Sequence, residues 1–310
     1  MKLRDARGEF RLSPDRLLRA VVRRVQLPVN YARLKWNAAH SARSVVDPAS
    51  GVVVSMTTHG ERLETVHLTI QSIAQGTVRP SRLVLALDSP LPDELPQGLQ
   101  RMVDRGVEIV ESAGRYGPHT KYYPYLCANP ESQERLVTAD DDVIYPRTWL
   151  EDLRAASDRH PGDIIAHRCH RIGVTSVAGR PEIRPYNSWE PCRTTEPSHL
   201  NFLTGVSGVL YPIGMQRALV REGERFQDVA PKADDVWLNW VAMRAGVRVR
   251  QVRSAPQNYS TVMSTQRTTL LSSNVQESAN DLQIRQAYRS GDIGLLMREF
   301  SIEEVCEDGR

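Results

Sequence analysis

Short apolar segments alternate with segments of helical periodicity over the first half of the chain. Val52–Met56 is an apolar run rich in valine that predicts a strand. The apolar residues after it recur at helical spacing up to Gly76: Leu63, Val66, Ile70 and Ile73. Continuous apolar strands that alternate with helices are typical of a mainly parallel sheet flanked by helices. The expected fold class is therefore α/β, Rossmann-like, with a ligand site outside the carboxyl ends of the strands.

The same alternation predicts further elements along the chain. Strands are expected at Leu83–Leu87, Val107–Val110, Arg135–Ala139, Asp163–Cys169, Gly205–Tyr211 and Val247–Val252. Helices are expected at Leu99–Arg105, around Lys121–Cys127, from Pro146, at Asp234–Ala245, and in a helical tail at Asp281–Tyr288 and Leu295–Phe300. Residues Gly173–Leu203 are rich in Pro, Gly, Ser and Thr, which favours long loops.

Composition narrows the class of protein. The 310 residues are 40% hydrophobic and 25% charged, as in globular chains that bury a large core. No apolar stretch approaches the roughly 20 residues that cross a bilayer, and the N-terminus lacks an apolar signal segment, so a cytoplasmic location is expected. The four cysteines are scattered without a Cys-x-x-Cys pair, which favours unpaired thiols. We expect an N-terminal arm at residues 1–48, a main domain at 49–255 and a helical extension at 256–310.

The N-terminal arm is basic. Residues 1–43 contain 11 Lys or Arg and three Asp or Glu. Ser13 and Pro14 are typical of a helix start, and the apolar and basic residues that follow fall on opposite helical faces. Such a helix could lie peripherally on the anionic inner face of a membrane; the alternative is a helix packed on the core with its arginines in water. The net charge of +3 does not indicate a nucleic-acid partner.

Three consecutive carboxylates, Asp140, Asp141 and Asp142, follow the apolar strand that ends at Ala139. Ionised side chains this close repel one another, and their burial is costly unless a cation compensates. Mg²⁺ and Mn²⁺ prefer oxygen ligands and share their remaining positions with phosphates and water. The cluster therefore predicts a divalent-cation site that holds a diphosphate. The alternative is an acidic turn whose carboxylates face solvent.

The segment Thr138–Pro146 with Trp149-Leu150 resembles the Asp-x-Asp segment of family-2-like GT-A glycosyltransferases of the bacterial polysaccharide and glycan type. Four further motifs line up with that family in the same order. They are Val53 to Arg62 with Thr57 and Thr58, the lysine of Thr120-Lys121-Tyr122, the segment Gly205–Pro212, and the acidic pair in Lys232–Trp237. The resemblance covers roughly residues 52–252. It implies a GT-A fold and transfer of a sugar from a nucleotide-sugar donor, with UDP as the expected nucleotide.

The resemblance also implies roles for single residues. Asp140 and Asp142 would hold Mn²⁺ or Mg²⁺, and Asp235 or its alternative Asp234 would be the catalytic base. Donor-binding residues would be Thr57, Thr58, Arg62, Lys121, Asp140 and Asp141. Acceptor-binding residues would be Tyr186, Trp189, Gly205, Ser207 and Gly208, with a glycan or a lipid-linked molecule as acceptor. One carboxylate opposite the leaving group suits a single displacement with inversion.

Two departures from the family pattern qualify this expectation. The last histidine is His199, so no late histidine completes the metal site, and the cation would rely on aspartates, diphosphate and water. Gln266-Arg267 lacks the tryptophan of processive synthases, which favours a single addition over polymerisation.

Three other functions are alternatives. One is a sugar-nucleotide nucleotidyltransferase, which is disfavoured by the single glycine after the first strand. The others are a phosphohydrolase or phosphotransferase, and a non-catalytic protein that binds nucleotide sugars.

Overall fold

The computed structural model describes residues 29–262 and 273–308. The chain divides into two compact units, residues 1–42 and 43–310. In the first unit, residues 29–40 form a helix, on which the Lys35 ammonium lies 5.0 Å from the ring centroid of Tyr31. The basic amphipathic helix expected after Ser13 lies outside the described residues, as does Gln266-Arg267. The domain boundaries expected at residues 48 and 255 stay predictions.

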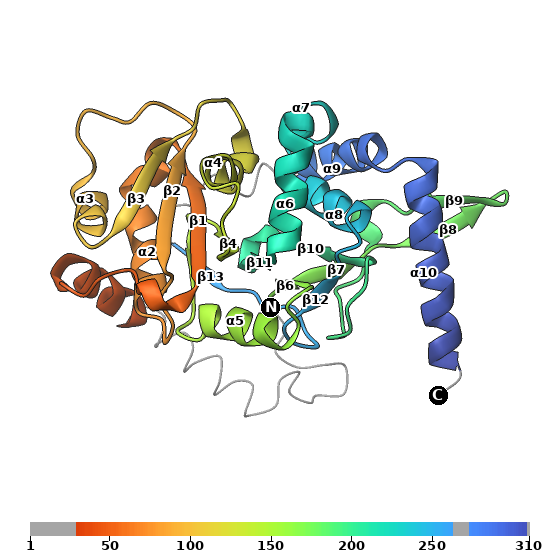
Figure 1. Cartoon of the computed structure of the whole chain (residues 1–310), viewed down its shortest axis with the longest axis horizontal. Coiled ribbons are helices and arrows are strands. Elements are labelled where there is room, and N and C mark those ends of the chain that lie inside the picture. The colour runs from red at the N-terminus through yellow and green to blue at the C-terminus, as the bar shows by residue number, and fades with distance from the viewer. Residues whose placement is uncertain (1–28, 263–272, 309–310) are drawn as a thin grey trace, which may run out of the picture. The chain divides into compact units, whose positions relative to one another are not determined.

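A seven-stranded sheet forms the centre of the second unit (Figure 1). Its order is β12-β6-β11-β4-β1-β2-β3. The strands are β1 (Val52–Thr58), β2 (Arg82–Leu87), β3 (Val107–Glu111), β4 (Arg135–Ala139), β6 (Ile164–Ala166), β11 (Val209–Tyr211) and β12 (Val249–Gln251). All neighbours pair in parallel except β11, which is antiparallel to both β4 and β6. The expected α/β class with a mainly parallel sheet is confirmed.

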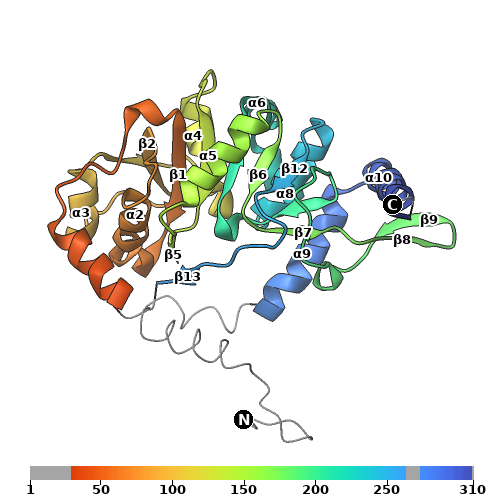
Figure 2. The same cartoon turned by 90° about the horizontal axis from the view of Figure 1, so that it is seen from below.

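Helices flank this sheet, which explains why its central strands are mainly apolar and buried (Figures 1 and 2). Every residue of β1 except Thr57 is buried. The α-helices of the second unit are α2 (Val66–Ala74), α3 (Gln97–Val103), α4 (Tyr123–Ala128), α5 (Trp149–Arg159), α6 (Ile213–Glu222), α7 (Phe226–Val229), α8 (Asp234–Arg244), α9 (Ser273–Ala287) and α10 (Ser290–Asp308). In α8, all residues from Val236 to Met243 are buried, so this helix lies inside the core, with Asp234 and Asp235 partly exposed and Arg244 exposed.

Three pairs of short strands lie outside the central sheet. They are β7 (Cys169–Arg171) with β10 (Asn201–Leu203), β5 (Val143–Ile144) with β13 (Ser260–Thr261), and β8 (Val174–Val177) with β9 (Arg180–Ile183). Short 3-10 helices connect the larger elements. They are η1 (Pro48–Ser50), η2 (Gly60–Glu64), η3 (Gly117–Lys121), η4 (Tyr186–Ser188), η5 (Gly205–Ser207) and η6 (Gly223–Arg225).

Three expected elements differ from the structure. The single strand expected at Asp163–Cys169 is divided into β6 and β7. The backbone amides at the break have different partners: the His167 amide donates to the Gly208 carbonyl, and the Cys169 amide donates to the Gln251 side chain. The expected loop region Gly173–Leu203 contains the β8–β9 hairpin and β10. The strand expected from Gly205 begins only at Val209, after η5 and Gly208.

Gly208 ends η5 with φ at +94°, a conformation that side chains rarely adopt. A Cβ atom there would lie 2.5 Å from Nε1 of Trp149. The indole N–H of Trp149 donates to the Ser207 carbonyl at 2.8 Å. Trp149 therefore fixes the loop that precedes β11, and only glycine fits between them.

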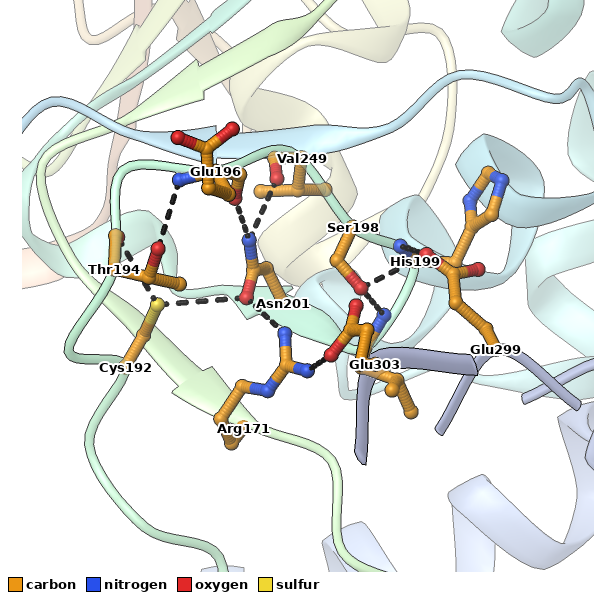
Figure 3. Close-up of polar contacts among 11 residues, drawn as sticks. Arg171, Cys192, Thr194, Glu196, Ser198, His199, Asn201, Val249, Glu299 and Glu303 are labelled. Atoms are coloured by element: carbon orange, nitrogen blue, oxygen red, sulfur yellow. Dashed lines mark hydrogen bonds and ion pairs between the residues drawn. The ribbon is translucent and has the colours of Figure 1, made fainter. Parts of the chain in front are cut away.

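The two expected tail helices are confirmed in position but are longer than the pattern indicated. Within the second unit, helix α10 lies beside the β8–β9 hairpin (Figures 1 and 2). Figure 3 shows how it is held: Glu303 pairs with Arg171, and Glu299 accepts from the Ser198 hydroxyl and the His199 amide, each at 2.9 Å. No helix within residues 29–262 and 273–308 combines the length and apolarity needed to span a bilayer.

Candidate active site

The acidic segment Asp140–Asp142 lies directly after β4, beside the carboxyl end of β1. Met56 is opposite Ala139 in the parallel register, so the residues that follow each strand meet at one edge of the sheet. We call this edge the carboxyl edge and define it by Thr57, Thr58 and Asp140–Asp142. It lies where parallel sheets of this kind bind ligands.

Asp141 is the buried member of the triplet, with 4% of its side chain exposed. The Thr58 hydroxyl donates to one carboxylate oxygen at 2.7 Å, and the Arg62 guanidinium donates to the other at 2.6 Å. Its backbone carbonyl accepts from the Thr69 hydroxyl on α2 at 2.8 Å. Asp141 thus joins β1, η2 and α2, and its carboxylate holds Arg62 in place at the edge.

Asp140 and Asp142 are more exposed, at 24% and 15% of their side chains. The Arg62 guanidinium lies 3.5 Å from an oxygen of Asp142. Burial raises the pKa of Asp142, and the charge of Arg62 opposes that rise only in part. The carboxylate of Asp142 is therefore incompletely compensated by the protein.

Two backbone contacts fix this segment, and the sequence did not indicate either of them. The Asp140 amide donates to the phenol oxygen of Tyr145 at 2.9 Å. The Val262 amide donates to the Asp142 carbonyl at 2.7 Å, next to the pairing of β13 with β5. In the sequence, Tyr145 was only part of the Asp-x-Asp segment. The contact of Val262 could not be predicted, because its partner Asp142 is distant in sequence.

Lys121 joins the acidic triplet to a second acidic pair. Its ammonium lies 2.8 Å from Oδ1 of Asp140 and 3.2 Å from Oδ2 of Asp234, with 11% of its side chain exposed. Burial acts to lower the pKa of Lys121, but the carboxylates of Asp140, Asp234 and Asp235 more than offset it and hold the pKa well above its ordinary value. Lys121 is therefore a permanent positive charge between two groups of carboxylates.

Asp88 supports the segment that carries Lys121 and was not singled out from the sequence. It follows β2, and its carboxylate accepts from the amides of Tyr116 and Gly117 and from the hydroxyl of Thr120, at 2.7 to 3.0 Å. These bonds fix η3, at whose end Lys121 lies. An aspartate directly after an apolar strand was the signal that could have identified it.

Asp235 lies in the first turn of α8 and faces the loop before β11. Its Oδ1 accepts from the Gly205 amide at 2.9 Å. A Cβ atom at Gly205 would lie 3.2 Å from both this oxygen and the Lys121 ammonium, so all three groups adjoin one another. Burial, followed by the charge of Asp234, raises the pKa of Asp235 to about 8. The raised pKa means that the carboxyl of Asp235 is largely protonated at neutral pH and becomes a carboxylate able to accept a proton as pH rises through about 8.

The site contains more negative than positive groups. Five aspartates, at positions 140, 141, 142, 234 and 235, surround two cations, Arg62 and Lys121. With Asp235 protonated, negative charge still exceeds positive charge. Oxygen donors of this kind suit Mg²⁺ or Mn²⁺. Within the described ranges no group of three or more His, Cys, Asp or Glu side chains could hold a metal ion, so a cation here needs ligands from a bound molecule or water besides Asp140 and Asp142.

The residues expected to bind the acceptor have different surroundings. Ser207 is buried and donates to the Gln257 carbonyl at 2.7 Å, and Gly208 packs against Trp149. Trp189 is also buried, and its indole donates to the Arg184 carbonyl at 2.9 Å. Tyr186 is half-buried, with its ring centroid 5.9 Å from that of His170. Val206, beside Gly205, is 38% exposed.

No protein-family model matches the chain, and no curated protein matches its sequence. The structure is similar to solved structures with low sequence identity. TarS residues 1–349 from S. aureus has a TM-score of 0.45 and 14% identity, with 80% of this chain and 70% of that chain covered. Mannosyltransferase PcManGT from Pyrobaculum calidifontis, solved with GDP-Man and Mn²⁺, has a TM-score of 0.45 and 16% identity over 86% and 75%. GalNAc-T7, solved with UDP, GalNAc and Mn²⁺, has a TM-score of 0.40 and 14% identity over 66% and 42%.

Proposed function

We propose that this chain is a GT-A glycosyltransferase that transfers a sugar from a nucleotide-diphosphate donor, with UDP as the nucleotide, to a hydroxyl of a glycan or lipid-linked acceptor. The observation that carries the proposal is the meeting of two acidic groups at Lys121. Asp140 and Asp142 come from the end of β4, and Asp234 and Asp235 come from the start of α8. One group suits a cation and a diphosphate, and the other suits removal of a proton.

On the donor side, Asp140 and Asp142 would hold Mn²⁺ or Mg²⁺. When bound, the cation would neutralise negative charge on the departing diphosphate. Lys121 and Arg62 add fixed positive charge at the same edge, which stabilises the leaving group without a change of protonation. Thr57 and Thr58 lie at the end of β1, where the nucleotide would bind. Asp141 acts indirectly, since its carboxylate is taken up by Thr58 and Arg62.

On the acceptor side, Asp235 would be the base. Asp234 is ion-paired with Lys121, whereas among the described contacts the carboxylate of Asp235 accepts only from the Gly205 amide, a weaker donor. In one displacement, the acceptor oxygen bonds to the anomeric carbon while the bond from that carbon to the diphosphate oxygen breaks. The diphosphate leaves with the electron pair, and Asp235 takes the hydroxyl proton. Attack opposite the leaving group inverts the anomeric configuration.

A nucleotide-sugar panel tests the proposal. Thermal unfolding is measured with UDP-, GDP- and dTDP-sugars, each with and without Mn²⁺, and release of nucleoside diphosphate is followed in parallel. The expected result is a Mn²⁺-dependent rise in Tm with one nucleotide class, lost in Asp142→Asn and retained in the exposed control Asp93→Asn. No rise with any nucleotide sugar contradicts the proposal. Release of pyrophosphate from a nucleoside triphosphate and a sugar phosphate would instead identify a nucleotidyltransferase.

A further inference from the structure

Arg168 lies close to the loop that contacts the proposed base. It follows His167 between β6 and β7, opposite Thr204 in the antiparallel register that continues from β10 and β7. The Thr204 amide and hydroxyl both donate to the Arg168 carbonyl, at 3.1 and 3.3 Å. The next residue, Gly205, donates to Asp235. The backbone of Arg168 is therefore fixed beside the loop that contacts α8, whereas Thr57, Thr58, Asp140 and Asp141 lie at the ends of β1 and β4.

Arg168 is half-buried, and its positive charge has no described carboxylate as an ion-pair partner. Among the side chains that the structure describes, at residues 29–262 and 280–305, no Asp or Glu forms an ion pair with it. Nη2 of Arg168 lies 3.2 Å from Nε2 of His170. The guanidinium is the donor and the imidazole nitrogen is the acceptor, because a guanidinium cannot accept a hydrogen bond. Burial, followed by the charge of Arg168, lowers the pKa of His170, so the imidazole stays neutral. The hydrogen bond orients Arg168 but leaves its positive charge in place.

Arg171, three residues further along, shows the opposite arrangement (Figure 3). It donates to the Asn201 side chain at 2.7 Å and forms an ion pair with Glu303 of α10. Its charge is used to hold the C-terminal helix. Arg168 directly precedes β7 and Arg171 ends it, so the alternation of side chains along extended backbone directs the two arginines to opposite faces. Only Arg168 keeps a charge available to a bound molecule.

An aromatic wall adjoins this charge. The His170 ring lies 5.9 Å from the ring of Tyr186, which packs in turn on Trp189 and Phe202. A planar guanidinium binds phosphate or carboxylate oxygens through two parallel hydrogen bonds. An aromatic ring nearby offers an apolar face to a sugar. The arrangement suits an acceptor that carries both an anionic group and sugar rings.

We propose that Arg168, oriented by His170, binds an anionic group of the acceptor, a phosphate or a carboxylate, close to the hydroxyl that receives the sugar. This inference rests on the proposed function and adds the chemical class of the acceptor. Lys121, Arg62 and the cation serve the donor diphosphate, and Arg168 serves the acceptor. The acceptor is therefore an anionic glycan, a polyol phosphate or a sugar linked to a lipid diphosphate, rather than a neutral glycan.

The test compares acceptors of matched length. The panel contains a glycerol-phosphate oligomer, an oligogalacturonate, a citronellyl-diphosphate-linked sugar and a neutral cello-oligosaccharide, each with the donor that raises Tm. The wild type should glycosylate or bind an anionic member more tightly than the neutral one. Arg168→Gln should raise KM, or Kd by thermophoresis, for that member about 10- to 100-fold, the effect of losing a charge-assisted pair. Arg168→Lys should recover part of the loss, and the exposed control Arg180→Gln should match the wild type.

Two results overturn the inference. One is tighter binding or faster use of the neutral oligosaccharide by the wild type, and the other is an Arg168→Gln variant whose KM and Kd for all anionic members are unchanged. The donor-dependent rise in Tm separates these results from failure of the proposed function. A wild type that shows no rise with any donor refutes glycosyl transfer itself, whereas a normal rise with no anionic preference refutes only the acceptor class. Preference among phosphate, carboxylate and lipid diphosphate identifies the source of the charge.

Discussion

Lys121 and Asp234 form a buried ion pair, with 3.2 Å between the ammonium and Oδ2 of the carboxylate. The same ammonium contacts Asp140 at 2.8 Å, so one cation joins the end of β4 to the start of α8. Because the pair is largely shielded from water, salt screens it little. Lys121 therefore contributes to both the stability and the charge balance of the site.

Lys121→Met should impair both properties. Removing the cation leaves Asp140 and Asp234 without their partner, and breaking a buried pair costs about 3 kcal/mol in the free energy of unfolding. Sugar transfer should fall by about 100-fold or more, because the leaving group loses a fixed positive charge. Urea denaturation and a nucleoside-diphosphate release assay measure the two effects. The exposed control Lys232→Met should keep wild-type stability, and an equally stable Lys121→Met would refute the importance of the pair.

The pKa of Asp235, raised to about 8, predicts an alkaline activity profile. If the carboxylate is the base, kcat/KM should increase from pH 6 to pH 9 with an apparent pKa near 8 and then level off. Asp235→Asn should abolish transfer at every pH while donor binding persists. Transfer that is unchanged in Asp235→Asn, and lost in Asp234→Asn, would assign the base to Asp234.

The same shift has a consequence for stability. A carboxyl group whose pKa is higher in the folded state than in the unfolded chain holds its proton more tightly when folded. The stabilisation that protonated Asp235 gives the folded state is fully present below the pKa of the unfolded chain, near 4, and is lost as pH rises to about 8. The wild type should therefore lose stability relative to Asp235→Asn between pH 4 and pH 8. Equal pH dependence of Tm in the two proteins would contradict the buried, protonated state.

Asp141 should be more important for stability than its neighbours. Its carboxylate accepts from Thr58 and Arg62, and such charged hydrogen bonds contribute about 2 kcal/mol each. Asp141→Asn should lower the free energy of unfolding by at least about 2 kcal/mol. Asp142→Asn should change stability far less but should eliminate the Mn²⁺-dependent rise in Tm. The reverse ranking of the two variants would show that Asp142, not Asp141, is the structural aspartate.

Gly208→Ala should be strongly destabilising. The new methyl group would overlap the Trp149 indole in a backbone conformation that alanine avoids. We expect a loss of about 2 kcal/mol or more by urea denaturation. Gly214 on α6 is the matched control, because a Cβ there meets no atom within 4 Å and its φ is not positive. Gly214→Ala should stabilise the protein by about 0.5 to 1 kcal/mol. Similar effects of both changes would rule out the contact with Trp149 as the reason.

The sequence was sufficient for the parallel part of the sheet. Val52–Met56, Leu83–Leu87 and Arg135–Ala139 are mainly apolar because helices flank the sheet that they form, and each run lies within a strand of the structure. It was not sufficient between Asp163 and Tyr211. There the backbone bonds of His167 and Cys169 go to Gly208 and Gln251, which no local pattern reveals.

The candidate site, like the sheet, could be predicted from the sequence only in part. The carboxylate cluster and Lys121 were visible as motifs, and the structure brings them together with Asp234 and Asp235. The difference among three consecutive aspartates was not visible. Which of them faces Thr58 depends on the register of β1 and β4, a pairing between segments distant in sequence. The anchoring of Tyr145 and Val262 depends on tertiary contacts of the same kind.

Anomalous diffraction at the manganese edge tests the central claim most directly. Crystals grown with Mn²⁺ and the nucleoside diphosphate that raises Tm should show one strong peak between Asp140 and Asp142, within coordination distance of both carboxylates and of the diphosphate. Ammonium and carboxylate positions in the same maps would show whether Lys121 still joins Asp140 to Asp234. A nucleotide bound elsewhere, with the carboxyl edge occupied only by water, would contradict the account.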